Sequence, residues 1–383
     1  MTLTHDCPAL EAVTALIRWT ENSQDHAARW RSESGMPVPK RVVIVDDRIT
    51  ADAAYRLACE GTAMLWRGDF QNARQLLQAL ARRTERKKPK LAATPLEAFN
   101  LHRQAQSQRA RTLAMLLLEF GSGHQLALRR APDVAAACRD AYGSSEEGYV
   151  ASLRELLGVI GSHEWRKTGV EIASLGARIY PHYGVFAPIR GEYVELVARA
   201  ALPSTVLAFD IGTGTGVLAA VLAKRGVQQV LGTDQDTRAL ACATENIRQL
   251  GLQSQVQIIE ADLFPAGLAP LIVCNPPWLP ARPSSPIEYA VYDPDSRMLR
   301  GFLQGLATHL TEQGEGWLIL SDLAEHLGLR SRDQLIAWIG AAGLRVIERL
   351  DTRPVHPRAT DPTDTLHRAR AAEITSLWRL AQA

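Results

Sequence analysis

The chain has 383 residues, a length that predicts more than one domain. Hydrophobic residues make up 46% of it and charged residues 22%, which is enough apolar material for sizeable cores and excludes a wholly disordered chain. The formal net charge of +2 does not by itself predict a polyanionic partner. No leader-like start and no run of membrane-spanning length is visible, so we expect a soluble cytoplasmic protein without a membrane contact. The five cysteines are scattered without a Cys-x-x-Cys pair, so we expect no metal and no disulfide framework.

The first region, residues 1–163, is predicted to be a mostly helical accessory domain with one or two strands. Val42–Val45 is an apolar run that predicts a short buried strand. Helical spacing predicts helices over Ala9–Trp19, Ala51–Ala81, Thr94–Leu118 (giving way to a strand near its end), Ala131–Tyr142 and Tyr149–Ile160. Nothing in this region indicates a reaction.

A basic run separates two of these helical blocks, because six of the nine residues from Arg82 to Lys90 are lysine or arginine. Two interpretations are open: a solvated linker in which Pro89 ends the helix, and an electrostatic contact with RNA or the ribosome. No aromatic residues interleave with the charges, so the linker is favoured.

Residues 164–190 are predicted to be a hairpin-like connector, because glycines at 169, 176 and 184 punctuate short β-like runs. A helix is expected to begin at Gly191.

The strongest signal in the chain runs from Val206 to Gly216, in the sequence VLAFDIGTGTG. An apolar run predicts a strand that ends at Asp210, and three glycines then alternate before a helical pattern begins at Val217. Glycine has no Cβ and tolerates positive φ, so such a loop brings bare backbone close to a ligand at a helix N-terminus. The spacing fails the dinucleotide fingerprint, since Val217 stands at its third glycine position, and no Gly-Lys-Ser/Thr follows to make a P-loop.

Two further strands are predicted, each with an acid at or just after its end. Gln229–Asp234 predicts one that ends in a carboxylate, and Val256–Glu260 predicts another that is followed by Asp262. In open α/β folds these carboxyl ends of the strands form the ligand-binding edge.

The glycine loop, Asp234 and Asp262 together resemble the class I S-adenosylmethionine-dependent methyltransferases. The resemblance covers residues 190–383 and implies an α/β fold with a seven-stranded, doubly wound, Rossmann-like sheet, and S-adenosylmethionine as the methyl donor. It further implies that Asp234 accepts hydrogen bonds from both ribose hydroxyls and that Asp262 faces the adenine amine. The cofactor-binding residues that we predict on this basis are Asp210, Gly212, Thr213, Gly214, Gly216, Asp234, Gln235, Asp262, Leu263 and Asn275.

A second motif, Asn275-Pro276-Pro277-Trp278, follows an apolar strand at Leu271–Cys274. The prolines fix φ and remove two backbone donors, so the nearby carbonyls point outward in a rigid arrangement. The Asn275 side-chain oxygen and the Pro276 carbonyl can accept both hydrogens of a planar NH₂ group, while Trp278 can stack on its π face. Holding that nitrogen in line with a methyl sulfonium favours transfer through positioning and electrostatics. We therefore predict that these four residues are catalytic.

The longer form, Asn275 to Pro280, resembles the Asn-Pro-Pro-Tyr-Ile-Pro of the HemK-like release-factor glutamine methyltransferases, with tryptophan in place of tyrosine. Pro188-Ile189-Arg190 likewise resembles their approach to the cofactor site. The resemblance implies methylation of a glutamine side chain in a protein of the translation apparatus. Two alternatives stay open: an exocyclic base amine in RNA or DNA, which would need a displaced or single-stranded base, and a cofactor-binding scaffold without activity.

The C-terminal part is predicted to complete a methyltransferase domain over residues 191–383. Its expected elements are helices at Met298–Leu310 and Arg332–Ala342 and strands at Gly316–Asp322, Leu344–Leu350 and Glu373–Leu380, the last one antiparallel. The sequence leaves open the acceptor, the oligomeric state and the role of residues 1–163.

Overall fold

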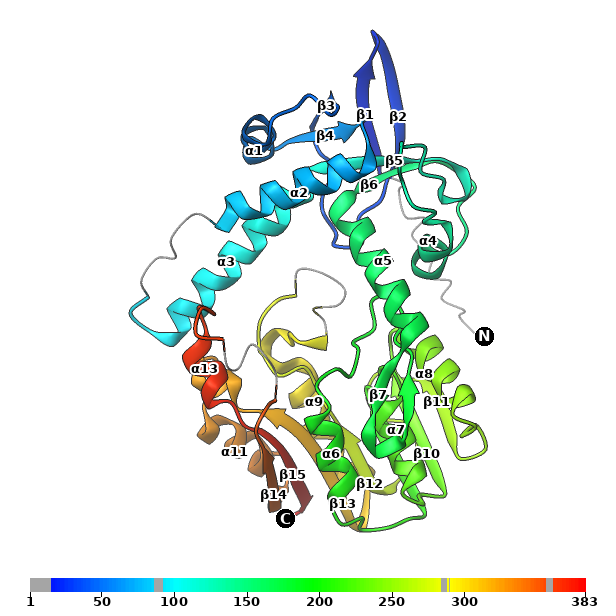
Figure 1. Cartoon of the computed structure of the whole chain (residues 1–383). Helices are drawn as coiled ribbons and strands as arrows, with labels where there is room; N and C mark the ends of the chain where they lie inside the picture. Colours follow the sequence, from blue (N-terminus) through cyan, green and yellow to red (C-terminus); the bar gives the residue numbers. More distant parts are fainter. Residues whose placement is uncertain (1–14, 86–91, 284–287, 289, 356–360) are drawn as a thin grey trace, which may run out of the picture. The chain divides into compact units, whose positions relative to one another are not determined.

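The computed structural model describes residues 15–85, 92–283, 288, 290–355 and 361–383. The chain forms two compact units, one of residues 1–87 with 109–158 and the other of residues 88–108 with 159–383 (Figure 1). The second unit includes residues 92–108, which lie within the first of the segments expected from the sequence. None of the helices in the described ranges combines the length and the apolar character needed to cross a membrane.

The first unit is built on a six-stranded mixed sheet with the order β1-β2-β6-β5-β4-β3. The antiparallel hairpin of β1 and β2 forms one edge of this sheet. The strands β5, β4 and β3 are parallel neighbours, and β3 forms the opposite edge. The strands are β1 (Leu16–Glu21), β2 (Gln24–Trp30), β3 (Arg41–Val45), β4 (Thr62–Trp66), β5 (Leu116–Phe120) and β6 (Tyr149–Ser152). The helices of this region are α1 (Ala51–Cys59), α2 (Phe70–Glu85), α4 (Ala135–Tyr142), the second part of α3 (Pro95–Leu113) and the start of α5 (Leu153–Thr168).

This sheet corrects the secondary structure expected for the first region, which is organised around six strands rather than one or two. The expected helix at Ala9–Trp19 is wrong where the structure describes it, since β1 begins at Leu16, and residues 9–14 lie outside the described residues. The expected helix at Ala51–Ala81 is two helices separated by β4, and Tyr149–Ile160 begins as a strand. All five residues of β4 are buried, and a strand buried on both faces lacks the alternation that would distinguish it from a helix.

The second unit contains a seven-stranded sheet with the order β11-β10-β9-β12-β13-β15-β14. Its first five strands are parallel, whereas β15 runs antiparallel to both of its neighbours. This confirms the predicted doubly wound sheet. The strands are β9 (Leu207–Ile211), β10 (Gln229–Asp234), β11 (Val256–Glu260), β12 (Ala269–Cys274), β13 (Leu310–Ser321), β14 (Leu344–Thr352) and β15 (Thr375–Gln382).

Helices cover both faces of this sheet (Figure 1). One core joins α6 (Glu192–Arg199), α7 (Val217–Lys224) and α8 (Thr237–Gln249) to the sheet, and a second core joins α9 (Arg297–His309) and α11 (Arg332–Ala341) to the opposite face. In β9, Ala208 belongs to the first core and Phe209 to the second, as alternation along a strand requires.

Smaller elements complete the second unit. β7 (Val170–Ile172) and β8 (Ala177–Ile179) pair as an antiparallel hairpin within the expected connector. Two short helices, α10 (Leu323–His326) and α13 (His367–Ala372), follow β13 and precede β15.

Candidate active site

The two sequence motifs meet where the strand order of the seven-stranded sheet reverses. β9 and β12 are parallel neighbours, and their register ends with Ile211 opposite Cys274. Gly212 and Asn275 come next in the chain, so they leave the same edge of the sheet side by side. β10 lies on the other side of β9 and brings Asp234 to that edge. This is the switch point at which open α/β sheets bind their ligands.

The glycine loop depends on glycine for both conformation and space. Gly212, Gly214 and Gly216 have φ angles of +70°, +56° and +79°, in the left-handed region. A Cβ on Gly216 would lie 3.3 Å from both Cα and Cβ of Ala243 on α8, closer than side chains usually pack, whereas one on Gly212 would meet only the flexible methyl end of Met298. The Thr213 N–H donates to the Thr233 carbonyl at 2.8 Å, which ties the loop to β10. The loop therefore presents bare backbone at its three glycines. Its position is fixed by the hydrogen bond to β10 and by its close approach to α8.

Asp210 links the glycine loop to α7. Its Oδ2 accepts a hydrogen bond from the Thr213 hydroxyl at 2.7 Å and another from the Ala219 N–H at 3.0 Å. The side chain is buried, and burial raises its pKa to about 6 although both hydrogen bonds favour the ionised form. Every bond described for this carboxylate lies within the loop and the first turn of α7, so it holds the loop in shape.

Asp234 stands at the end of β10 with both oxygens engaged by backbone. Oδ2 accepts from the Gly214 N–H at 3.1 Å and Oδ1 from the Asp236 N–H at 3.0 Å. Burial raises its pKa, and backbone hydrogen bonds from Asp236, Gly214 and Gln235 oppose that effect. Each carboxylate oxygen can accept more than one hydrogen bond, so the group keeps acceptor capacity for a ligand.

An open pocket of about 520 Å³ lies against this edge. Two of the predicted cofactor residues, Gln235 and Leu263, line it, and Leu263 has a φ of +73°. Asp262, the residue before Leu263, forms an exposed ion pair with Arg297, with Nη2 and Oδ2 3.0 Å apart. The remaining lining residues are Pro294, Asp295, Arg297, Met298, Arg300, Gly301 and Gln304. A ligand amine that reached Asp262 would therefore share its carboxylate with Arg297, a partner that the sequence motifs do not reveal.

Asn275 and Trp278 are hydrogen-bonded to each other across the proline pair. The indole N–H of Trp278 donates to Asn275 Oδ1 at 2.9 Å. Trp278 is partly buried and packs against the cores on both faces of the sheet. The sequence predicts an aromatic surface at this position, and the structure adds a donor that holds the Asn275 side chain.

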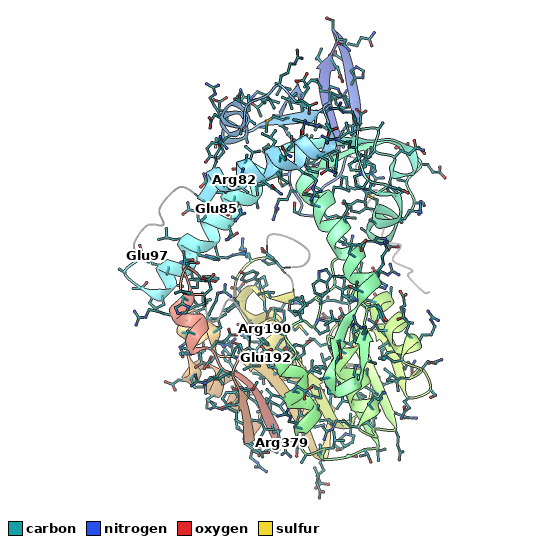
Figure 2. All side chains as sticks on the ribbon, in the orientation of Figure 1. Arg82, Glu85, Glu97, Arg190, Glu192 and Arg379 are labelled. Atoms are coloured by element: carbon teal, nitrogen blue, oxygen red, sulfur yellow. The ribbon has the colours of Figure 1, made fainter. Side chains whose placement is uncertain are left out.

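Arg190 lies over the ring of Trp278, with Cζ 5.1 Å from the ring centroid. Two carboxylates hold the guanidinium: Glu192 accepts from Nε at 2.8 Å, and Glu373 accepts from Nη2 at 3.1 Å (Arg190 and Glu192 are labelled in Figure 2). Glu373 is only 3% exposed and also accepts from the Ser321 hydroxyl at 2.7 Å. Sequence reasoning missed Glu373 and Ser321, because Glu373 lies 183 residues from Arg190 and no motif marks either residue.

The first half of α3 packs beside the loop that follows Trp278. Phe99 is 3% exposed and belongs to an apolar cluster that includes Leu279 and Leu323. Leu279 is the residue directly after Trp278. A helix far upstream of the motifs therefore supplies part of the packing on the acceptor side of the second unit.

Arg103 on α3 makes three contacts with that same loop. Its guanidinium lies 4.0 Å from the ring centroid of Tyr292, donates to the Arg282 carbonyl at 2.6 Å and donates to Glu288 Oε2 at 3.1 Å. A planar fork that stacks and donates in two directions is a property of arginine that lysine does not share. Arg103 thus ties together three separate positions of the loop.

A glycine loop at the switch point, an acid at the end of the next strand and an Asn-Pro-Pro-aromatic turn on the other side define a methyltransferase domain of class I. Residues 182–328 match the family model described as Methyltransferase small domain. This match spans 147 of the 383 residues and contains the glycine loop, Asp234, Asp262 and the Asn-Pro-Pro-Trp motif.

Two proteins are similar in sequence to part of this chain. The ribosomal protein L11 methyltransferase of Rhodopseudomonas palustris is 39% identical over 137 residues, which is 34% of this chain and 45% of that protein. The release factor glutamine methyltransferase of Cereibacter sphaeroides is 31% identical over 166 residues, which is 42% of this chain and 56% of that protein. The chain thus spans about half the length of the curated relatives it matches.

Proposed function

We propose that this chain is an S-adenosylmethionine-dependent N-methyltransferase that acts on a planar amide or amine nitrogen, a glutamine side chain in a protein of the translation apparatus. The observation that carries the proposal is the position of Gly212 and Asn275 side by side at the switch point. Similar proteins are named for methylation of ribosomal protein L11 and of release factors, which supports a protein as the acceptor.

The residues at the site fit S-adenosylmethionine. The carboxylate of Asp234 suits the hydroxyl donors of a ribose, and Gln235 and Leu263 line the adjoining pocket. The glycine loop is joined to Asp234 through the Gly214 N–H and has bare backbone at its three glycines. When bound, this cofactor supplies an electrophilic methyl group on a sulfonium.

Asn275 and Pro276 would orient the acceptor nitrogen. An amide nitrogen is a poor nucleophile because its lone pair is delocalised into the carbonyl group. The Asn275 side-chain oxygen and the Pro276 carbonyl can each accept one N–H of the acceptor, which leaves the nitrogen lone pair directed at the methyl group. Transfer would form the N–C bond as the bond from the methyl carbon to the sulfonium sulfur breaks, which would leave a neutral thioether, and the nitrogen would release one proton to water.

The proposal predicts that Asn275→Ala lowers the rate of methyl transfer by about 100-fold, the usual effect of removing one fixed hydrogen-bonding group at a reacting centre. The measurement is transfer of labelled methyl into fractionated cell extract, followed by digestion with protease or nuclease and identification of the modified residue. Label in N5-methylglutamine is expected, and label in a nucleobase would instead support the alternative acceptor.

Cofactor affinity, measured by calorimetry, separates catalysis from binding in this experiment. Asn275 is one of ten predicted cofactor-binding residues, so we expect Asn275→Ala to weaken S-adenosylmethionine binding by no more than a few-fold, since the glycine loop and Asp234 are unchanged. A variant that binds the cofactor and still methylates as fast as the wild type would remove the catalytic role of Asn275.

A further inference from the structure

The hydrogen bond between Trp278 and Asn275 restricts how an acceptor can lie in the site. An indole N–H points along the plane of its ring, and a good N–H···O bond is close to linear. A linear bond of this kind places Asn275 Oδ1, 2.9 Å from Nε1, at the edge of the indole and near its plane. A ring stacked on the indole would sit about 3.5 Å above that plane, which exceeds the length of about 2.9 Å of an N–H···O bond. In that linear geometry, an acceptor nitrogen cannot bond to this oxygen while its own ring stacks flat on Trp278.

The face of Trp278 is also engaged. The guanidinium of Arg190 lies over the ring, and the two carboxylates that hold it, those of Glu192 and Glu373, are fixed within the second unit. Glu373 is itself fixed by the buried hydroxyl of Ser321. The rest of the indole packs against both cores of the sheet. Trp278 is thus held by a hydrogen bond at its edge, by Arg190 on one face and by apolar packing around the rest of the indole. The ring is therefore part of the packed structure around the site and not a free surface on which an acceptor could stack.

The same bond decides which way the Asn275 amide points. A side-chain amide has an oxygen that accepts and an NH₂ that donates, and the two ends can exchange by a flip. The Trp278 N–H can only donate, so a flipped Asn275 would set two donors against each other. The oxygen has two acceptor positions. Trp278 uses one of them, which leaves the other for one N–H of the acceptor.

We propose that Trp278 is a positioning residue whose indole N–H locks the Asn275 oxygen in the orientation that receives the acceptor nitrogen, backed by Arg190 and Glu373. The acceptor is bound edge-on and unstacked, by the Asn275 oxygen and the Pro276 carbonyl. This inference rests on the proposed function and deepens it, because it assigns recognition to the two oxygens and not to the aromatic face.

Trp278→Phe tests the proposal, because phenylalanine keeps an aromatic ring under Arg190 and removes only the indole end with its N–H. With labelled S-adenosylmethionine and cell extract, we expect the maximal rate of methyl transfer to fall about 10-fold. The half-saturating amount of extract protein and the affinity for S-adenosylmethionine should change less than about two-fold. If Trp278 served instead as a stacking surface, Trp278→Phe would keep the wild-type maximal rate, because the aromatic ring is retained. An unchanged maximal rate would therefore overturn the proposal.

Trp378→Phe is the matched control. Trp378 lies on β15, belongs to one core of the same sheet and has the guanidinium of Arg332 5.1 Å from its ring centroid, and neither residue lines the pocket. This variant should transfer methyl groups at the wild-type rate.

A spectroscopic measurement tests the hydrogen bond without relying on activity. In ¹⁵N-labelled protein saturated with S-adenosylhomocysteine, the Trp278 indole resonance is assigned by its loss in Trp278→Phe. We expect Asn275→Ala to shift this resonance and to speed its exchange with solvent. An indole resonance unmoved by Asn275→Ala, or one shifted by the ring current of added guanosine, would overturn the proposal. Failure of the wild type to bind S-adenosylmethionine would instead overturn the proposed function itself.

Discussion

A single buried carboxylate, Asp210, connects the glycine loop to the stability of the second unit. Burial raises its pKa to about 6 in the folded protein, above the usual value of 3.8 that the unfolded chain retains. Between these two pH values the folded protein binds more protons than the unfolded chain. Stability therefore falls as the pH rises from about 4 to about 6, because the buried group becomes charged.

Asp210→Asn should remove this pH dependence. The side-chain oxygen of asparagine can accept both hydrogen bonds that now end on Oδ2, and it carries no charge. Without cofactor, we expect the free energy of unfolding of the variant, relative to wild type, to rise by roughly 2 kcal/mol between pH 4 and pH 7.5. Urea unfolding at several pH values measures it, and Asp236→Asn at the exposed N-cap of α8 is the control. A difference that does not vary with pH would contradict the raised pKa.

Residues of the candidate site differ in how far the sequence reveals them. Asp210, Asp234 and Asn275 could be placed at strand ends because the spacing within each motif fixes their order along a single strand and loop. The pairing of Asp262 with Arg297 depends on where α9 begins, and the contact of Arg190 with Glu373 on how β15 enters the sheet. Such contacts join distant parts of the chain, so no local pattern carries them.

Helix α3 is the element whose placement matters most for the acceptor side. The sequence predicts a helix there and says nothing of its partners, because its apolar face fits any apolar surface. In the structure, Phe99 and Arg103 direct its first half to the loop after Trp278. We therefore expect α3 to affect acceptor binding and to leave cofactor binding alone.

Arg103→Lys tests this expectation, since lysine keeps the charge and loses the planar fork that stacks on Tyr292. The half-saturating amount of extract protein in the methyl-transfer assay should rise about 5- to 10-fold, with the affinity for S-adenosylmethionine unchanged. Arg109→Lys is the control, because Arg109 lies on the same helix and pairs with Glu85 in the first unit. Equal behaviour of the two variants would show that α3 has no part in acceptor binding.

Elements were predictable where amphipathic periodicity or a flanking motif marks them. Strands β10 and β11 have their predicted bounds, and α11 differs by one residue at its end. The failures lie in the first region, where β1 follows residues with helical spacing and β4 is buried at every position. For such strands the pairing partner decides the structure, and that information is not local.

The whole molecule divides its apolar residues among separate cores, and the candidate site belongs to only one of its two units. A ligand stabilises only the states of the protein that bind it. Its binding free energy therefore raises the free energy of opening only for those unfolding reactions that destroy the binding site. If the two units open separately, cofactor binding should therefore slow hydrogen exchange in the second unit and leave exchange in the first unit unchanged.

Hydrogen exchange of the full chain, with and without S-adenosylhomocysteine, measures this directly. At a ligand concentration 100 times Kd, we expect exchange in β9, β10 and the glycine loop to slow by up to about 100-fold. The amides of β4 and β5, in the sheet of the first unit, should exchange at the same rate in both samples. Asp234→Ala is the control, since it removes the acceptor at the end of β10 and should lose the protection at the same ligand concentration. Equal slowing in both sheets would mean that the two units open as one, so that residues far from the site share in the binding energy.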